Sequence, residues 1–390
     1  MKQTILHLVI CLLALGATAC DKHSGSNLHP KGDEAADTLR RLVVVYMAAD
    51  NSISSLADAD VEEMERGAQS IPDDCALAVY LDNYTDRGTP GILLIDKANG
   101  KRTFKTYAED PVSTDSAVME RVLDDILKGI PAKEHALVLW SHSTGWVPRE
   151  NDRKRTWGSD RGNEMPVTTL AHVLANTGIH WKYIFYDSCF MQCVEVAYQM
   201  RHLTDWSIAS PIEIPGLGAP YDYIMPHLFQ AEGFAHDIPH AYHEHYENQS
   251  YGVILSSIRS SRLDNLARAT ATALDTLGSV STNSVQQYGA YTENAHWFGE
   301  FYDMASLMNA CLCPADYATW HAAMEQAIPH RFATKRWYSM YSSINARLTD
   351  PDHFAGTSMY IPTEGRTGMN ATWHQLDWAG QMPPTIIIIN

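Results

Sequence analysis

The sequence predicts an α/β fold built on a mostly parallel β-sheet with helices on both faces. Two short apolar runs, residues 136–142 and 183–189, are rich in β-branched and aromatic residues and too short for helices. Neither run alternates polar with apolar residues, which indicates strands buried on both faces. Ligand sites in such sheets lie at the carboxyl ends of the strands, so we expect His142 and Cys189 at one edge.

The first half of the chain supplies most of the expected sheet. The expected strands are residues 41–47, 75–81, 91–95 and 103–107, and the expected helices are residues 56–69 and a segment that follows Ser113. Asn99-Gly100 is a hairpin turn dipeptide, so the strands that flank it should be antiparallel. Gly129 and Pro131 end the second helix.

The second half continues the alternation and then becomes mainly helical. We expect an exposed charged loop at 147–165, helices at 166–178 and 190–200, strands at 206–210 and 252–257, helices after 262, and strands at 356–362 and 385–389. The expected division is a core over residues 39–258 and a C-terminal part over residues 259–390 packed on it.

The N-terminus has the features of an export signal. Lys2 precedes an apolar stretch from Ile5 to Leu15, too short to span a membrane. Ala17-Thr18-Ala19 fits a cleavage site after residue 19, and Cys20 directly after it resembles the lipidated cysteine of bacterial lipoproteins. We therefore expect a signal peptide at 1–19, a tether at 20–38, and a cell-envelope protein that meets the membrane only through a lipid on Cys20.

Charge and cysteine content narrow the function. The formal net charge is −17 and moves to −18 when the signal with Lys2 is removed, which argues against nucleic acid as a partner. Cys11 leaves with the signal and Cys20 is expected to carry lipid, so five of the seven cysteines remain. An odd number in an exported protein favours a free, catalytic thiol.

Cys189 has the surroundings that a nucleophilic thiol requires. An unperturbed thiol has a pKa of ~8.5 and needs a cation or a helix N-terminus to ionise near neutrality. The helix expected at 190–200 would begin directly after Cys189, and His142 would accept the thiol proton. His142 precedes Cys189 by 47 residues, close to the ~50 residues of caspase-type spacing.

Four stretches of the sequence form one pattern: Leu139-Trp140-Ser141-His142 with Gly145-Trp146, Asp187-Ser188-Cys189-Phe190-Met191 with Val194-Glu195-Val196-Ala197-Tyr198, Tyr46-Met47 with Asp50-Asn51, and Ser210 to Gly218. Together they resemble the clostripain family of cysteine endopeptidases, relatives of caspases, legumain and gingipains. The resemblance covers residues 43–223 well. It implies a caspase-like three-layer fold and peptide or protein substrates.

The resemblance also implies residue roles. Cys189 would be the nucleophile and His142 would protonate the leaving amine, with the backbone amides of Cys189 and Ser143 as the oxyanion hole. Asp187 would line the primary pocket and select Arg or Lys at the cleavage site. Ser210 and Glu213 would also bind substrate.

Two departures from the family pattern and two further expectations accompany these roles. Ser143 stands where the family has Gly, and Glu213 supplies an acid that the family often has directly after Ser210. Asp50 is a further substrate-binding candidate at a strand end. Family members often cut themselves between His and Cys, and Arg153, Lys154 and Arg155 are the candidate sites here.

Other interpretations of these residues have less support. A catalytically silent surface homologue that binds peptides is the main alternative, because of Ser143. Cys193 lies one helical turn beyond Cys189 and either packs or forms a redox pair with it. A serine hydrolase lacks its Gly-x-Ser-x-Gly motif.

We expect no cofactor. Cys311 and Cys313 have the wrong spacing for zinc, and His236, His240, His243 and His245 fit a solvated helix face. Some family members respond to calcium; the chain contains no Asp-rich loop of the EF-hand type, so a calcium requirement stays open without a motif to support it.

Overall fold

The structure, a computed structural model, describes most of the chain from residue 38 onward. The described residues are 38–84, 86, 88–147, 157–275, 277, 279–282, 285–288, 301–338, 345–346, 348, 353–384 and 387–388. The expected signal peptide, the tether with Cys20, and the basic cluster Arg153, Lys154 and Arg155 lie outside them.

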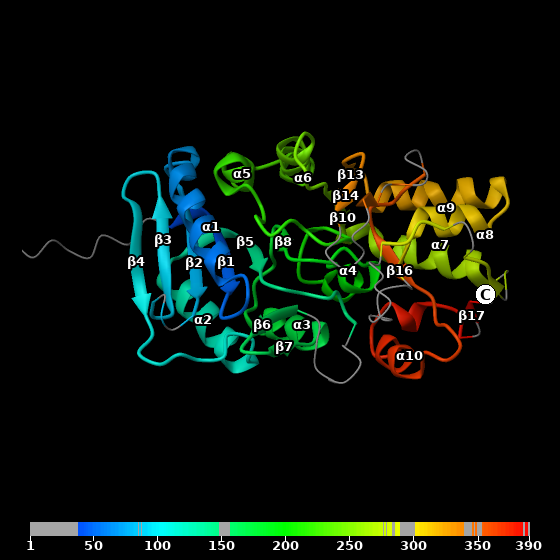
Figure 1. Ribbon diagram of the computed structural model, residues 1–390, viewed down its shortest axis with the longest axis horizontal. Helices are drawn as coiled ribbons and strands as arrows, with labels where there is room; N and C mark the ends of the chain where they lie inside the picture. Colours follow the sequence, from blue (N-terminus) through cyan, green and yellow to red (C-terminus); the bar gives the residue numbers. More distant parts are fainter. Residues whose placement is uncertain are drawn as a thin grey trace, which may run out of the picture. The chain divides into compact units, whose positions relative to one another are not determined.

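A nine-stranded mixed sheet organises the fold, in the order β13-β10-β9-β8-β5-β1-β2-β3-β4 (Figure 1). Its strands are β1 (Leu39–Ala48), β2 (Cys75–Asp82), β3 (Gly91–Asp96), β4 (Gly100–Thr106), β5 (Ala132–Trp140), β8 (Ile184–Asp187), β9 (Trp206–Ala209), β10 (Ile254–Arg259) and β13 (His330–Ala333). The five central strands, from β9 to β2, are parallel, and the outer strands pair antiparallel. The predicted α/β class and the predicted hairpin of β3 and β4 are confirmed.

Helices cover both faces of this sheet. They are α1 (Ser54–Arg66), α2 (Ser116–Gly129), α3 (Val167–Asn176), α4 (Val194–Met200), α5 (Tyr221–Leu228), α6 (Phe234–Tyr246), α7 (Leu263–Asp275), α8 (Met304–Cys311), α9 (Pro314–Ala327) and α10 (Thr367–Trp373). Figure 1 shows α5 and α6 above the sheet and α2 and α3 below it, and buried residues of α1 share one hydrophobic core with those of α5 and α6. Alternate residues of β1 enter the two hydrophobic cores on opposite faces, which explains why its sequence is uniformly apolar.

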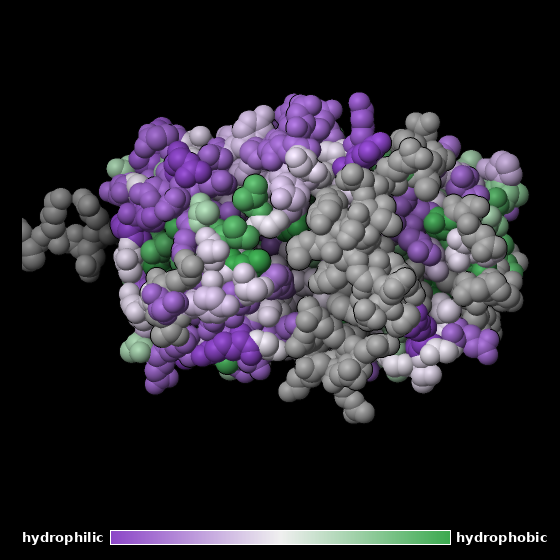
Figure 2. All heavy atoms as spheres, viewed as in Figure 1, coloured by the Kyte–Doolittle hydropathy of each residue, from purple (hydrophilic) through white to green (hydrophobic). Residues whose placement is uncertain are grey.

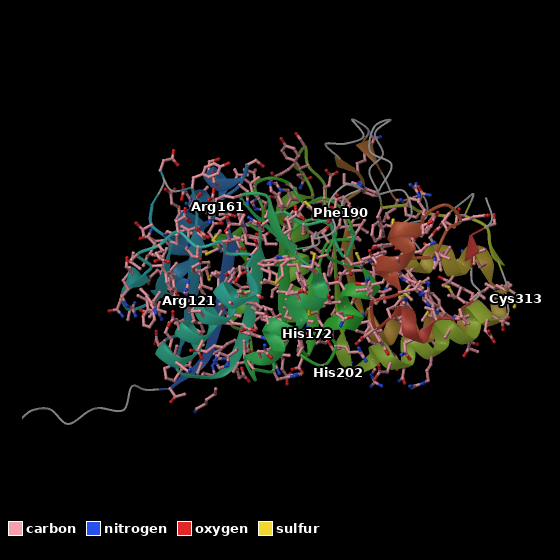
Figure 3. The ribbon with its side chains drawn as sticks, turned by 90° about the horizontal axis from the view of Figure 1, so that it is seen from below. Arg121, Arg161, His172, Phe190, His202 and Cys313 are labelled. Carbon is pink, nitrogen blue, oxygen red and sulfur yellow. The ribbon has the colours of Figure 1, made fainter. Side chains whose placement is uncertain are left out.

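The register of the central strands sets the functional edge. Trp140 of β5 pairs with Asp187 of β8 in a parallel ladder. His142 and Cys189 each follow this pair by two residues, so both leave the sheet at its carboxyl edge, as predicted. Figure 3 shows Phe190, next to Cys189, on one side of the molecule and His202, which precedes β9, on the opposite side.

Short two-stranded ladders complete the structure. They are β6 (Trp157–Asp160) with β7 (Asn163–Met165), β11 (Ser279–Val280) with β17 (Ile387–Ile388), β12 (Phe301–Asp303) with β16 (Ser358–Tyr360), and β14 (Trp337–Tyr338) with β15 (Asn345–Ala346). The described end of the predicted 147–165 loop is therefore the β6–β7 hairpin, and buried Trp157 and Asp160 anchor it. No helix in the described part of the chain is long and apolar enough to cross a membrane.

The C-terminal residues do more than pack on a separate core. β13 from this part forms the edge of the central sheet by pairing with β10. The backbone N–H of Ser358, in β16, donates to the carbonyl of Gln192 at 2.9 Å. The C-terminal part therefore contacts the segment that follows Cys189.

Candidate active site

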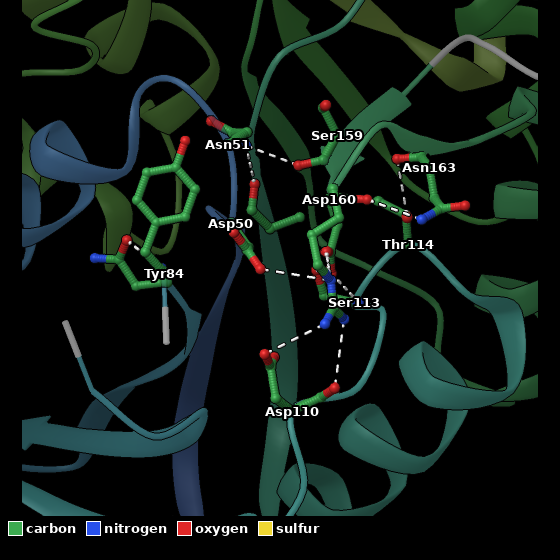
Figure 4. A network of polar contacts seen from close by, with 12 residues as sticks. Asp50, Asn51, Tyr84, Asp110, Ser113, Thr114, Ser159, Asp160 and Asn163 are labelled. Atoms are coloured by element: carbon green, nitrogen blue, oxygen red, sulfur yellow. Dashed lines mark hydrogen bonds and ion pairs between the residues drawn. The ribbon is translucent and has the colours of Figure 1, made fainter. Parts of the chain in front are cut away.

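Polar side chains tie three strand ends together beside the predicted dyad. Ser141 Oγ donates to the carbonyl of Ala48 at 2.7 Å and accepts from the N–H of Ser159 at 2.9 Å. Asn51 Nδ2 donates to the carbonyls of Ala48 and Ser159 at 2.9 and 2.7 Å (Figure 4). The ends of β1 and β5 and the hairpin strand β6 are thereby fixed relative to one another.

His142 and Ser143 follow directly on β5. His142 is half-buried, and its Nε2 lies 2.9 Å from Ser52 Oγ. The buried Ser143 donates from Oγ to the carbonyl of Cys189. The residue that replaces the family glycine therefore binds the backbone of the nucleophile segment.

Cys189 and Phe190 form a turn and irregular chain follows, so the helix predicted at 190–200 is wrong for its first residues. Phe190 has a left-handed backbone, with φ of 61°. The N–H groups of Phe190 and Gln192 donate to the carbonyls of Ile212 and Ser210, both at 3.0 Å. A residue with a left-handed backbone does not belong to an α-helix, and α4 begins only at Val194.

The pKa of Cys189 also differs from the prediction, because no helix begins directly after this residue. The cysteine is half-buried, and burial raises the pKa of its thiol to about 12. The Glu213 and Asp187 carboxylates contribute to this raised pKa, and the backbone N–H of Ile214 opposes it. The helix N-terminus that was expected to stabilise a thiolate is absent from this position, and the resting thiol is neutral.

Asp187, the predicted pocket residue, lies buried beneath the dyad with 2% of its surface exposed. The N–H of Ala219 donates to both carboxylate oxygens at 3.1 Å, and the Tyr221 hydroxyl donates to Oδ2 at 2.8 Å. Asp187 therefore anchors the loop between β9 and α5 as well as carrying charge.

A second acid, Asp60 of α1, lies beside Asp187 and was not predicted. An ideal Cβ on Gly218 would lie 3.2 Å from Oδ2 of each aspartate, so both carboxylates face the same glycine. Trp140 Nε1 donates to Asp60 Oδ2 at 2.6 Å. No described Lys or Arg forms an ion pair with either acid.

The pKa values of both acids are raised, because burial disfavours the two negative charges. Burial and the neighbouring Asp187 raise the pKa of Asp60 to about 9. Burial also raises the pKa of Asp187, to about 6, while the hydrogen bonds from Ala219 and Tyr221 oppose this shift. The sequence did contain a signal, since Asp60 falls on the apolar stripe of α1 with Ala57, Val61 and Met64.

Asp50, the other strand-end candidate, belongs to an internal acidic network (Figure 4). Arg161 Nε lies 3.5 Å from the Asp50 carboxylate and 3.1 Å from that of Asp160, and its Nη1 lies 3.3 Å from that of Asp110. Asp50 is 5% exposed. The structure thus gives this carboxylate an internal partner, and its contact with substrate stays a prediction.

Ser210 and Glu213 lie on the loop that borders Cys189. The buried Ser210 accepts from the N–H of Ile212 through Oγ at 3.2 Å and forms a local turn. Glu213 is half-buried and close enough to Cys189 to influence its thiol. The part of the chain that the structure describes contains no group of three or more His, Cys, Asp or Glu arranged to hold a metal ion.

Fold and site define a cysteine peptidase of caspase-like α/β architecture. The chain belongs to the clostripain family, whose model, Peptidase_C11, matches residues 45–366. The X-ray structure of a secreted C11 cysteine protease from Bacteroides thetaiotaomicron, in complex with an irreversible peptide inhibitor, is similar. It is 31% identical with a TM-score of 0.77, and the match covers 88% of this chain and 98% of that one.

Two further solved structures resemble the chain. One is described as an inactive zymogen C11 protease from Parabacteroides distasonis, with 27% identity, a TM-score of 0.76, and coverage of 88% of this chain and 98% of that one. The other is a B. fragilis cysteine protease with 29% identity, a TM-score of 0.52, and coverage of 57% and 95%. A comparison with curated proteins found no match.

Proposed function

We propose that this peptidase cleaves peptide bonds after Arg or Lys by a dyad of Cys189 and His142. The observation that carries the specificity is the buried pair Asp60 and Asp187, which faces Gly218 without a cationic partner among the described residues. A buried carboxylate pair is expensive unless a cation compensates it. The guanidinium or ammonium group of a substrate Arg or Lys would be that cation.

The proposed chemistry uses four proton transfers, each to or from His142. As Cys189 Sγ attacks the carbonyl carbon, its proton passes to His142, and the backbone amides of Ser143 and Cys189 bind the oxyanion. Collapse of this intermediate breaks the C–N bond, and His142 protonates the leaving amine. Water then attacks the acyl-enzyme with His142 as base, which restores the thiol and releases the new carboxylate.

Maturation by self-cleavage after Arg153, Lys154 or Arg155 is part of the proposal. A resting enzyme with a neutral Cys189 and with His142 bound to Ser52 fits a precursor that awaits activation. One similar structure is itself described as an inactive zymogen. The proposal also includes export of the protein and lipidation at Cys20. A similar protease is described as secreted.

Fluorogenic peptides that differ only at the cleaved residue test the specificity. Wild-type enzyme should cleave the Arg and Lys peptides at least a hundredfold faster in kcat/KM than peptides with neutral citrulline or with Asp. Asp187→Asn should reduce this preference, and Cys189→Ala should abolish cleavage. Activity on Asp alone would overturn the pocket assignment, and no difference from Cys189→Ala on any peptide would support the silent homologue.

Intact mass measurement after storage tests maturation. The wild-type chain should be cut between residues 153 and 156, and Cys189→Ala should stay intact. Addition of active enzyme to Cys189→Ala shows whether the same bond is accessible in trans. Cutting of isolated Cys189→Ala at the same bond would contradict self-cleavage.

A further inference from the structure

Glu195 is a buried acid that the proposed chemistry does not use. It lies on α4 with none of its surface exposed, and its Oε1 accepts from the N–H of Tyr360 at 2.8 Å. Its Oε2 is buried without a hydrogen-bond partner, and no described Lys or Arg forms an ion pair with it. Burying a carboxylate oxygen without a partner costs roughly several kcal/mol of solvation free energy. A buried acid of this kind therefore needs an explanation.

Two indole groups lie beside this carboxylate. Trp146 and Trp373 are both buried, and neither indole N–H has a well-formed hydrogen bond. Both are close enough to Glu195 to lower its pKa, which burial raises to about 7. One acceptor and two donors therefore face one another in a water-poor site.

Trp146 connects this cluster to the catalytic edge. It lies four residues after His142, and its ring stacks edge-on against Tyr360 at 5.2 Å between centroids. Between them, Gly145 has a φ of 70°, and a Cβ there would lie 2.9 Å from both Cys193 Sγ and the carbonyl of Phe190. The segment that carries His142 is thus in direct contact with the segment that carries Cys189.

We propose that Glu195 is a positioning residue: held by the Tyr360 N–H, its carboxylate binds the Trp146 indole and so fixes residues 142–146 against Cys189. Trp373, on α10, contacts the same carboxylate from the C-terminal part and has no direct connection to His142. The inference rests on the proposed dyad, and it assigns the C-terminal part a role in aligning that dyad.

The matched pair Trp146→Phe and Trp373→Phe tests the assignment, because each variant removes one indole N–H from the same carboxylate. Competent sites are counted by titration with an irreversible thiol-reactive arginine peptide. Trp146→Phe and Glu195→Met should lower kcat per competent site at least tenfold with KM changed less than threefold. Trp373→Phe should stay within twofold of wild type, and Glu195→Gln, which keeps an acceptor oxygen, should recover part of the loss.

Two results would overturn the proposal. One is equal kcat per competent site in Trp146→Phe and Trp373→Phe. The other is a set of variants in which only the number of competent sites falls, as a purely structural role predicts.

If the wild type cleaves no basic peptide, the proposed function fails. The positioning role is then decided by the rate at which iodoacetamide alkylates Cys189, which should change in Trp146→Phe and not in Trp373→Phe.

Discussion

Replacing Asp60 by Asn tests whether the buried acid pair holds a proton in the empty enzyme. Burial and Asp187 raise the pKa of Asp60 from 3.8 to about 9. A carboxyl with a raised pKa binds its proton more tightly in the folded state. Its contribution to stability is therefore complete below pH 4 and is lost as the pH rises toward 9. The Asn side chain keeps an oxygen for the indole of Trp140 and removes the titration.

The size of the effect follows from linkage. One group protonated in the folded state and ionised in the unfolded state lowers the free energy of unfolding by about 1.4 kcal/mol per pH unit. Between pH 6 and 8 the contribution of Asp60 is therefore about 2.7 kcal/mol. The wild type should lose this amount over the interval, and Asp60→Asn should have a slope shallower by about 1.4 kcal/mol per pH unit.

Urea unfolding at pH 6, 7 and 8 measures these slopes, with Cys189→Ala as the common background to prevent self-digestion. Asp74→Asn is the matched control. Hydrogen bonds from Cys75 and Arg40 lower the pKa of Asp74, so it is ionised throughout this range in both states. Parallel profiles for the background and Asp60→Asn would refute the raised pKa of Asp60 and remove the electrostatic case for the basic pocket.

Three further outcomes follow from the site geometry. Alkylation of Cys189 by iodoacetamide, followed by mass spectrometry, should accelerate nearly tenfold per pH unit from pH 7 to 10, because its thiol pKa is about 12; a plateau near pH 8 would contradict this. Gly145→Ala should destabilise the fold by about 1–3 kcal/mol in urea unfolding, since φ is 70° and the Cβ would collide with Phe190. Ser143→Ala should cost about 1 kcal/mol in the same assay through the lost hydrogen bond to Cys189, and an unchanged midpoint would deny that bond.

The sequence predicted the central strands and the edge at which they end, for a physical reason. Strands buried on both faces need continuous apolar residues, and parallel register then places successive strand ends together. His142 and Cys189 follow the paired residues Trp140 and Asp187 by the same two positions. This relation required only the two apolar runs and their polar ends.

The helix after Cys189 could not be placed because tertiary pairing decides its start. Residues 190–200 have helical composition, but the N–H groups of Phe190 and Gln192 bond to the loop that follows β9. Partners some twenty residues away in the chain leave no local signal. The edge strand β13 was missed for the same reason, since its pairing with β10 depends on distant residues. Asp60 is different, because its place on the apolar stripe of α1 is a local signal that could have been used.

The neutral thiol of Cys189 and the acid pair Asp60 and Asp187 together predict that a basic substrate side chain activates the nucleophile. Because burial raises the pKa of Cys189 to about 12, its thiol is neutral at pH 7. The charge of Asp187 is one cause of that raised pKa. A basic substrate side chain that neutralises Asp187 therefore also favours ionisation of the thiol. The Arg and citrulline peptides should consequently differ in kcat as well as in KM, whereas a pocket that only binds substrate would change KM alone.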